Sequence, residues 1–336
     1  MKAVVFDGKG HANTVEKPVP ELPQGYALVK VMAAGICGTD IETLYHNPNQ
    51  PPDAIPGHEI SGIIERTNGC RTIKTGDRVV VNIHITCLKC DHCREGNLIF
   101  CKDLTCIGFE LDGGDAQFVA VPEVNLRVIP DDITYEQGML LTDALGTPYH
   151  AVKKADIKKG ELVGVSGAGP LGIMCILSVL HLGGVVVAID VVEKRLEAAK
   201  KFGAAYTVNA LGDVKKEVDI ITKGKGLDKV IDCSGNEAAI KTDLEMIKCR
   251  GIMVQVGVCT KITMNLYDLI VAREIIFKGS RNFHDSEIPE MIELIRHSPN
   301  INDVFTHRFS LDEAQQAFDL AERREGLKIL LVPDQA

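Results

Sequence analysis

The sequence predicts an α/β protein in which a mainly β N-terminal part precedes a doubly wound parallel sheet. In residues 1–149, short β-rich runs are separated by Gly, Pro and Asn turns. In residues 150–283, apolar strands alternate instead with amphipathic helices, a pattern typical of a parallel sheet covered on both faces. We therefore expect two domains, and residues 284–336, which are too few for a third, are expected to pack onto the first.

The expected elements follow the chain in order. The runs at 27–31 and 78–81 are typical of antiparallel strands in the first domain. In the second domain, strands are expected at 162–166, 185–190, 229–232, 252–257 and 275–278. Helices are expected at 170–182, 192–202, 287–297 and 311–325, the last opened by a Ser310 cap, and C-terminal strands at 305–310 and 327–332.

The composition of the 336 residues excludes several classes of protein. Hydrophobic residues make up 45% and charged residues 25%, as in ordinary globular chains. Acidic residues outnumber basic ones, 46 to 37, which argues against nucleic acid as the main partner. Residues 162–189 carry no Asp, Glu, Lys or Arg, but glycines interrupt them, so no membrane span is expected. Because no signal peptide is visible and cysteines are clustered, we expect a cytoplasmic protein.

A glycine-rich turn follows the first strand of the second domain. Residues 167–172 read Gly-Ala-Gly-Pro-Leu-Gly and fit the G-x-G-x-x-G pattern of dinucleotide-binding turns. The first glycine allows the tight turn, the second lets the backbone approach a pyrophosphate, and the third allows close packing of helix on strand. Proline suits the first turn of the helix, whose N–H groups face the phosphates. The expected cofactor-binding residues are Gly167, Gly169, Pro170, Leu171 and Gly172.

An acidic residue, Asp190, ends the next expected strand. A carboxylate at this place can bind the ribose hydroxyls of an adenosine, and its charge would repel a 2′-phosphate, which favours NAD over NADP. The alternative is a simple glycine turn with a solvent-facing aspartate. Arg195, one helical turn further on, either covers the adenine or is a surface residue.

Four cysteines form a C-x2-C-x2-C-x7-C cluster in the first domain: Cys87, Cys90, Cys93 and Cys101. The short spacings let neighbouring thiolates converge on one ion, and four thiolates with no open position are typical of a structural zinc site. An iron–sulfur cluster is the alternative. In the bacterial ferredoxin pattern, however, the fourth cysteine follows after three residues and precedes a proline, whereas here the gap is longer and Lys102 follows.

Two further segments precede this cluster: Gly-Ile-Cys-Gly-Thr-Asp at 35–40 and Gly-His-Glu at 57–59. In this order, the four motifs resemble the zinc-dependent medium-chain dehydrogenase/reductase family, which contains the alcohol and polyol dehydrogenases. The resemblance covers almost the whole chain. It implies a GroES-like catalytic domain at 1–149, a Rossmann NAD-binding domain at 150–283, and hydride transfer between NAD and an alcohol, polyol or cyclitol hydroxyl.

The resemblance also implies a catalytic zinc site, which takes three protein ligands and keeps a fourth position open. Cys37 and His58 match two ligands of the family, and Glu59 matches the carboxylate that binds zinc directly or from just behind it. The third ligand position corresponds to Asp143, for which a helix N-terminal cap is the alternative role. Thr39 matches the hydroxyl relay between substrate and nicotinamide ribose. Glu42 stands where many members carry histidine, so it either passes on a proton or contacts a polar substrate.

The cofactors expected from these residues are one catalytic zinc ion, one structural zinc ion and NAD. The expected partner is a small alcohol, polyol or carbonyl substrate, with neither nucleic acid nor a membrane involved. A homo-oligomer is expected because relatives form dimers and tetramers. Two alternatives stay open: a zinc-dependent aldehyde reductase or dismutase, which the context of Asp143 favours, and a non-catalytic NAD-binding protein of the same fold.

Overall fold

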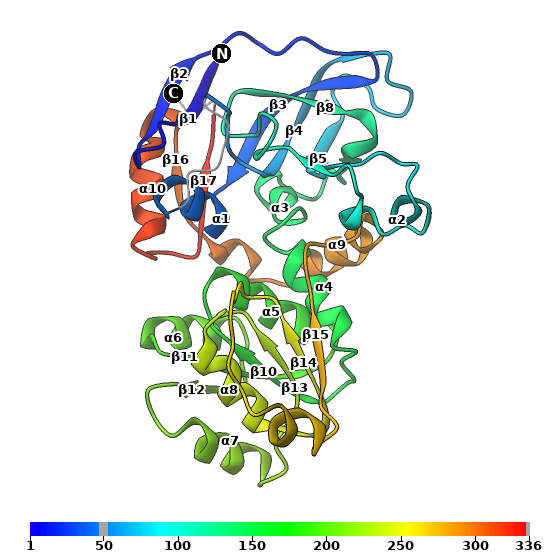
Figure 1. Cartoon of the computed structure of the whole chain (residues 1–336). Coiled ribbons are helices and arrows are strands. Elements are labelled where there is room, and N and C mark those ends of the chain that lie inside the picture. The colour runs from blue at the N-terminus through cyan, green and yellow to red at the C-terminus, as the bar shows by residue number, and fades with distance from the viewer. Residues whose placement is uncertain (47–52, 334–336) are drawn as a thin grey trace. The chain divides into compact units, whose positions relative to one another are not determined.

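A computed structural model describes residues 1–46 and 53–333, and the chain forms two compact units (Figure 1). The first unit contains residues 1–144, 284–288 and 301–336, and the second contains residues 145–283 and 289–300. The division thus differs from the expected domain boundaries in two places. Helix α4 (Gly146–Lys154) lies wholly in the second unit because it packs against helix α5 (Pro170–His181) of that unit.

The second difference concerns residues 289–300, which were expected to return to the first domain. They carry most of helix α9 (Ile288–His297), whose Glu290 accepts hydrogen bonds from the Tyr149 hydroxyl at 2.5 Å and the Lys153 ammonium at 2.7 Å. Both donors lie on α4, so these contacts join α9 to the second unit.

A seven-stranded sheet forms the centre of the first unit. Its order is β16-β17-β3-β4-β5-β9, and β8 also pairs with β3. The strands are β3 (Tyr26–Gly35), β4 (Glu59–Asn68), β5 (Arg78–Val81), β8 (Phe118–Pro122), β9 (Leu126–Val128), β16 (Phe305–Phe309) and β17 (Lys328–Leu331). Alternate residues of β3, among them Ala27, Val29 and Val31, are fully buried in one apolar core. This period of two is what a half-buried strand requires.

Shorter elements surround this sheet. Two hairpins pair β1 (Lys2–Phe6) with β2 (Ala12–Glu16) and β6 (His84–Ile85) with β7 (Thr105–Cys106). The helices are α1 (Gly38–Ile41), α2 (Asp91–Arg94), α3 (Tyr135–Leu140) and α10 (Ala314–Glu322). A π-helical turn, η1 (Glu42–His46), follows α1, and 3-10 turns are η2 (Leu98–Phe100), η3 (Glu123–Asn125), η5 (Asp285–Glu287), η6 (Ile301–Val304) and η7 (Leu311–Glu313).

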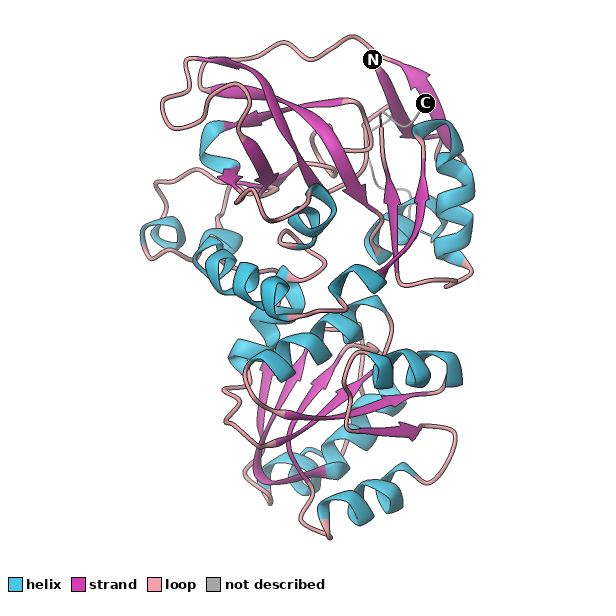
Figure 2. Ribbon diagram, turned by 180° about the vertical axis from the view of Figure 1, so that it is seen from behind, coloured by secondary structure: helices cyan, strands magenta, loops and turns pink. Residues whose placement is uncertain are grey.

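A six-stranded parallel sheet forms the second unit, with the order β12-β11-β10-β13-β14-β15. The strands are β10 (Leu162–Ser166), β11 (Val185–Asp190), β12 (Tyr206–Asn209), β13 (Leu227–Asp232), β14 (Ile247–Gln255) and β15 (Ile276–Gly279). Helices lie on both faces of the sheet (Figure 2), as parallel sheets require. They include α6 (Glu193–Lys201), α7 (Val214–Thr222) and α8 (Glu237–Met246), with the π-helical turn η4 (Tyr267–Val271) before β15.

The predicted α/β fold with a mainly β part and a Rossmann-like part is confirmed. The expected strands 162–166 and 185–190 have the observed bounds. Strand β12 was not expected, because it is only four residues long and lies at the edge of the sheet. Strand β14 begins at Ile247, earlier than the expected 252. The C-terminal helix divides into η7 and α10 after a Ser310 capping box. Among the described residues, the search for a helix with the length and hydropathy needed to cross a membrane finds none.

Candidate active site

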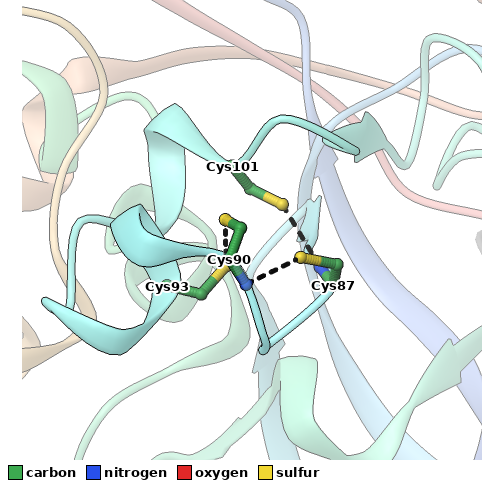
Figure 3. A group of neighbouring side chains, drawn as sticks. All are labelled: Cys87, Cys90, Cys93 and Cys101. Carbon is green, nitrogen blue, oxygen red and sulfur yellow. Dashed lines mark hydrogen bonds between the residues drawn. The ribbon is translucent and has the colours of Figure 1, made fainter.

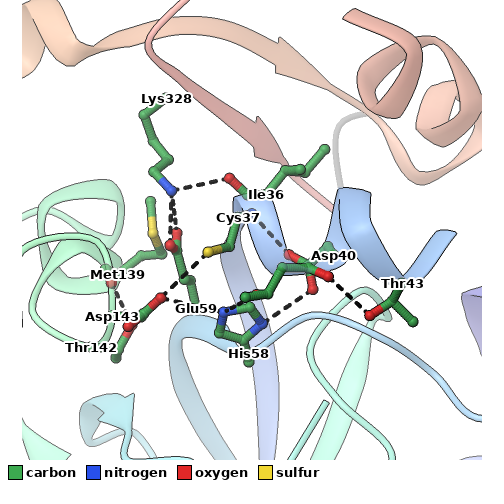
Figure 4. Close-up of polar contacts among 11 residues, drawn as sticks. Ile36, Cys37, Asp40, Thr43, His58, Glu59, Met139, Thr142, Asp143 and Lys328 are labelled. Carbon is green, nitrogen blue, oxygen red and sulfur yellow. Dashed lines mark hydrogen bonds and ion pairs between the residues drawn. The ribbon is translucent and has the colours of Figure 1, made fainter. Parts of the chain in front are cut away.

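Two neighbouring strands of the first unit and the turn after α3 bring a mixed group of side chains together (Figure 4). Cys37 follows the end of β3 at the N-terminus of α1, and His58 and Glu59 stand at the start of β4, where Glu59 pairs with Gly35. Asp143 comes from the turn after α3. One donor atom from each of Cys37, His58, Glu59 and Asp143 lies within 4.8 Å of the others.

The donor distances suit a metal ion. The Asp143 Oδ2 atom lies 3.4 Å from the Cys37 Sγ and 3.4 Å from the His58 Nε2. Ligands held at ~2.0–2.3 Å around tetrahedral zinc are about 3.3–3.8 Å apart. Sulfur, imidazole nitrogen and carboxylate oxygen are also the donor types that zinc takes in proteins. The group therefore fits a zinc ion in both spacing and chemistry.

A buried carboxylate, Asp40, fixes two of these donors. Its Oδ2 accepts the Cys37 backbone N–H at 2.8 Å, and its Oδ1 lies 3.1 Å from the Nδ1 of His58. A hydrogen bond at Nδ1 leaves the opposite nitrogen, Nε2, to face the other donors. Asp40 lies three residues after Cys37 on α1, so the short helix itself places the carboxylate under the site. Carboxylates commonly orient metal-binding histidines in this way.

Glu59 is held by a lysine from the far end of the chain. The Nζ of Lys328, at the start of β17, lies 2.8 and 2.7 Å from the two carboxylate oxygens of Glu59 and 3.0 Å from the Ile36 carbonyl. Both side chains are almost fully buried. The backbone at Gly35 packs so closely against Glu59 that a side chain has no space there: a Cβ at Gly35 would lie 2.0 Å from a Glu59 oxygen. Only glycine fits there.

The electrostatics of the group favour a bound cation. Burial raises the pKa of Glu59, and Lys328 opposes this. Burial and the Asp143 charge raise the pKa of the Cys37 thiol. Burial would lower the pKa of His58, but Asp40 and Asp143 raise it well above its usual value. These pKa shifts arise because several acidic groups are buried close together. A divalent cation bound among them would compensate their negative charge.

The remaining residues expected in this region lie in different surroundings. The Thr39 Oγ1 lies 3.4 Å from the His58 Nε2, beside the donor group. Thr39 and Glu42 are both exposed, and Glu42 stands at the start of η1. Asp143 does not cap the following helix, since α4 begins at Gly146 after the N-cap residue Leu145.

The four cysteines of the first unit converge as a second group (Figure 3). One sulfur from each of Cys87, Cys90, Cys93 and Cys101 lies within 4.8 Å of the others, and the Cys90 and Cys93 sulfurs are 3.5 Å apart. A disulfide needs about 2.05 Å, so these are free thiols grouped as metal ligands are. Backbone N–H groups of Cys87 and Asp103 point at the Cys101 sulfur at 3.3 and 3.4 Å.

Backbone donors also set the charge of this cluster. Hydrogen bonds from the backbone of Lys102 and Cys93 lower the pKa of Cys90 to about 6, and the backbone of Cys87 lowers that of Cys101. Burial raises the pKa of Cys93 to about 12. The protein therefore favours thiolate at two of the four sulfurs, and thiolate is the form that binds metal. With four sulfur donors and no other, the cluster suits a closed zinc site.

The glycine turn lies in the second unit between β10 and α5. Gly167 has a φ of +89°, and a Cβ at Gly172 would meet the Gly167 carbonyl oxygen at 1.9 Å, so both positions need glycine. Gly169 is the N-cap of α5 and Pro170 its first residue. The N-terminus of α5 thus presents free backbone N–H groups at the carboxyl end of the sheet, as a pyrophosphate requires.

Asp190 at the end of β11 is buried and does not face solvent freely. Its Oδ2 accepts the Ala168 N–H at 2.7 Å, and its Oδ1 accepts the Val192 N–H at 2.9 Å. The guanidinium of Arg195 lies 3.8 Å from the Asp190 Oδ2. The carboxylate therefore joins the glycine turn to the loop after β11, and Arg195 lies beside both.

Comparison with known proteins decides the family. The Zinc-binding dehydrogenase model matches residues 170–297, and the Alcohol dehydrogenase GroES-like domain model matches residues 23–131. Sorbitol dehydrogenase of Halalkalibacterium halodurans is 31% identical, with 99% of each chain covered. D-arabitol-phosphate dehydrogenase of Enterococcus avium is 31% identical over 98% of this chain and 97% of that protein. The structure of galactitol-1-phosphate dehydrogenase from Escherichia coli superposes with a TM-score of 0.93 at 26% identity, covering 99% of this chain and 100% of that one.

The chain belongs to the zinc-dependent medium-chain dehydrogenases. The predicted family membership is therefore confirmed, as is the prediction of an enzyme. Two residues of this dehydrogenase escaped the sequence reasoning. Asp40 had a local signal, since it is an acid at capping distance from Cys37 within the quoted motif. Lys328 had none, because only the pairing of β17 with β3 brings it to Glu59.

Proposed function

We propose that this dehydrogenase oxidises a hydroxyl of a polyol to a carbonyl, and that Cys37, His58 and Asp143 hold the catalytic zinc ion. The observation that carries the proposal is the convergence of these donors within 4.8 Å in a chain of the zinc-dependent family. A polyol is supported by the names of the relatives, which include sorbitol, D-arabitol-phosphate and galactitol-1-phosphate dehydrogenases. Bound zinc acts as a Lewis acid on the substrate oxygen, and bound NAD supplies the hydride acceptor.

The chain's own residues orient the site and move the proton. Asp40 keeps the His58 Nε2 turned toward the donor group, and Lys328 holds the Glu59 carboxylate beside it. Thr39, whose hydroxyl lies at this group, receives the substrate proton. Because Glu42 is exposed, we assign it to the outer end of the proton path, where it exchanges protons with solvent.

We propose NAD as the preferred cofactor. Asp190 is a buried acid at the end of β11 beside the glycine turn, so a 2′-phosphate there would meet its negative charge. Replacing the acid by Asp190→Ala should lower the efficiency with NAD and raise that with NADP. Steady-state kinetics with both cofactors test this, and an unchanged cofactor ratio would contradict the assignment.

We further propose a second zinc ion in the cysteine cluster, where two thiols are already disposed to ionise. A cytoplasmic location suits this cluster, because thiolate sites need reducing conditions and each of the 11 cysteines is a free thiol.

We propose a homo-oligomer that forms through the β15 edge of the second unit. Ile276 and Phe277 on this edge strand are 47% and 40% exposed, and Leu266, Tyr267 and Val271 nearby in sequence are more exposed still. An exposed apolar edge favours pairing with another chain. Light scattering should give an assembly for the natural protein and a smaller species for Phe277→Lys; a natural monomer would exclude the proposal.

One experiment tests the activity. The purified protein is incubated with NAD and a panel of polyols, polyol phosphates, simple alcohols and aldehydes, and NADH is followed by absorbance. We expect turnover of at least one polyol and none in Cys37→Ala, which should still bind NADH. Preference for aldehydes over every polyol would favour the reductase alternative, and no turnover of any substrate by zinc-loaded protein would contradict the proposal.

A further inference from the structure

Asp243 is a buried acid in the second unit that the dehydrogenase reaction does not use. It lies in α8, is 1% exposed, and neither carboxylate oxygen makes a hydrogen bond of good geometry within the described ranges. An ionised carboxylate buried without a donor or a cation is costly, so the group must either be neutralised or be compensated. Nothing in the candidate active site explains it.

The groups that face Asp243 include one other acid. Helix α8 packs against β10, β13, β14, α7 and η4. The Asp232 carboxyl on β13 and the Ser166 hydroxyl on β10 both lie within hydrogen-bonding reach of the Asp243 carboxyl. The nearby Cys233 thiol is partly buried and lies 3.4 Å from the Cys175 sulfur. Among the described residues of β14, α7 and η4, no charged group compensates Asp243.

Asp232, in contrast, has the surroundings of an ionised carboxylate. It is fully buried and accepts the Ser234 hydroxyl at 2.6 Å, the Gly235 N–H at 2.9 Å and the Gln255 side-chain amide at 2.7 Å. Two ionised carboxylates side by side have only acceptors and repel each other. If Asp243 carries a proton, the same contact becomes a hydrogen bond from Asp243 to Asp232, and no unpaired buried charge is left on Asp243.

The bonds of Asp232 shape a turn beside the glycine turn. They fix residues 233–236, which follow β13, from both the backbone and the side chains. A Cβ at Gly167 would lie only 3.0 Å from the Ser234 backbone nitrogen, so the two turns are in close contact. A change in the charge on Asp232 and Asp243 would therefore act on the backbone that forms the nucleotide site.

We propose that Asp243 is a positioning residue: it stays protonated, donates to Asp232, and thereby keeps the turn at 233–236 in the conformation that binds the nucleotide. This role rests on the proposed nucleotide site, but the protonation of Asp243 does not. Loss of the proton at alkaline pH places two negative charges side by side, which loosens the turn and weakens nucleotide binding. Burial, followed by the charge of Asp232, raises the pKa of Asp243 well above its usual value, in agreement with this role.

The test uses Asp243→Asn, because an amide stays neutral and can still donate to Asp232. Glu245→Gln is the matched control, since Glu245 is exposed on the same helix and undergoes the same change from carboxyl to amide. Because the folded chain keeps a proton that the unfolded chain loses near pH 4, the unfolding free energy of the natural protein should fall, relative to Asp243→Asn, as pH rises above about 4. This difference in unfolding free energy between the natural protein and Asp243→Asn should stop growing above the folded-state pKa of Asp243. Glu245→Gln should show no such difference from the natural protein.

NADH binding gives the second readout. As pH rises through the folded-state pKa of Asp243, the NADH dissociation constant of the natural protein and of Glu245→Gln should increase by up to about tenfold per pH unit. That of Asp243→Asn should stay nearly constant. Equal pH slopes in all three proteins would overturn the positioning role while leaving the nucleotide site intact.

Infrared spectroscopy of the natural protein reads the proton directly and does not depend on any variant folding well. We expect the C=O stretch of protonated carboxylic acids at neutral pH, weakened by the share of one carboxyl in Asp243→Asn and unchanged in Glu245→Gln, since the buried Asp115 also contributes to it. Absence of this band in the natural protein, or pH profiles of unfolding that run parallel in natural protein and Asp243→Asn, would overturn the proposal whether or not NADH binds. Failure of the natural protein to bind NADH would instead count against the proposed function.

Discussion

The two donor groups of the first unit are built in opposite ways. The cysteine cluster takes four identical donors from one short stretch, residues 87–101, and backbone N–H groups hold its sulfurs. The mixed group takes sulfur, nitrogen and oxygen donors from residues 37, 58, 59 and 143, and the Asp40 and Lys328 side chains hold three of these residues. A contiguous loop can be completed by its own backbone, whereas a site assembled across strands depends on partner side chains.

This difference predicts different responses to mutation. Each partner in the mixed group is a side chain that can be replaced, so the site should be sensitive to changes beyond its ligands. In the cysteine cluster the partners are backbone N–H groups, so only substitution of the cysteines themselves can remove a donor or its support. Four substitutions test this contrast.

The largest effect is expected for His58→Ala. In the proposed catalytic site the substitution removes a zinc ligand and with it several kcal/mol of transition-state stabilisation, so kcat/KM should fall about 1,000-fold or more. NADH binding, which uses the second unit, should be unchanged. Steady-state kinetics and NADH titration measure both quantities. Activity within tenfold of the natural protein would show that His58 is not a ligand.

Lys328→Met should strongly destabilise the first unit. The substitution leaves the Glu59 carboxylate buried without its cation, a loss of about 3–5 kcal/mol in the free energy of unfolding. Urea unfolding measures the change. In the double variant with Glu59→Gln, much of the stability should return, because no charge is then left unpaired. If the two single changes simply add, the ion pair is not the cause.

Asp40→Asn should have an intermediate effect. The amide oxygen can still accept the Cys37 N–H, but His58 loses its negatively charged partner, so zinc affinity or activity should fall about 10–100-fold. Competition with a zinc chelator gives the affinity. Asp91→Asn, an exposed acid next to Cys90, serves as the control and should change neither value.

The smallest effect on turnover is expected for Cys93→Ser. The variant should lose the zinc ion of the cysteine cluster and unfold at a lower temperature, because a structural zinc site contributes folding energy. Its kcat should stay within about tenfold of the natural value, because the mixed donor group lies elsewhere in the unit. Zinc content, thermal unfolding and kinetics test the three statements. A loss of activity as large as that of His58→Ala would contradict the division into structural and catalytic sites.

The sequence predicted the parts of the molecule that local spacing determines. The C-x2-C-x2-C-x7-C spacing and the glycine turn each lie within one short segment, so the residues that matter are visible together. The fold class was equally accessible, because strand–helix alternation is a repeating local pattern. The family resemblance supplied the mixed donor group as a hypothesis, since its four residues are spread over more than 100 positions.

What the sequence could not predict depends on tertiary contacts. The Lys328–Glu59 pair joins residues that are 269 positions apart. Glu42 was expected either to pass on a proton or to contact a polar substrate, and its exposure at η1 depends on how α1 and η1 pack. Asp243 reads as an ordinary polar residue of an amphipathic helix; its burial against Asp232 follows only from the packing of α8 on the sheet.

The central claim is that the mixed donor group binds a catalytic zinc ion, in addition to the zinc ion of the cysteine cluster. Anomalous scattering at the zinc edge, measured on crystals of the zinc-loaded protein, tests it most directly. We expect two peaks per chain, one among the four cysteine sulfurs and one within bonding distance of the Cys37 Sγ, the His58 Nε2 and an Asp143 oxygen. A single peak, confined to the cysteine cluster, would contradict the account.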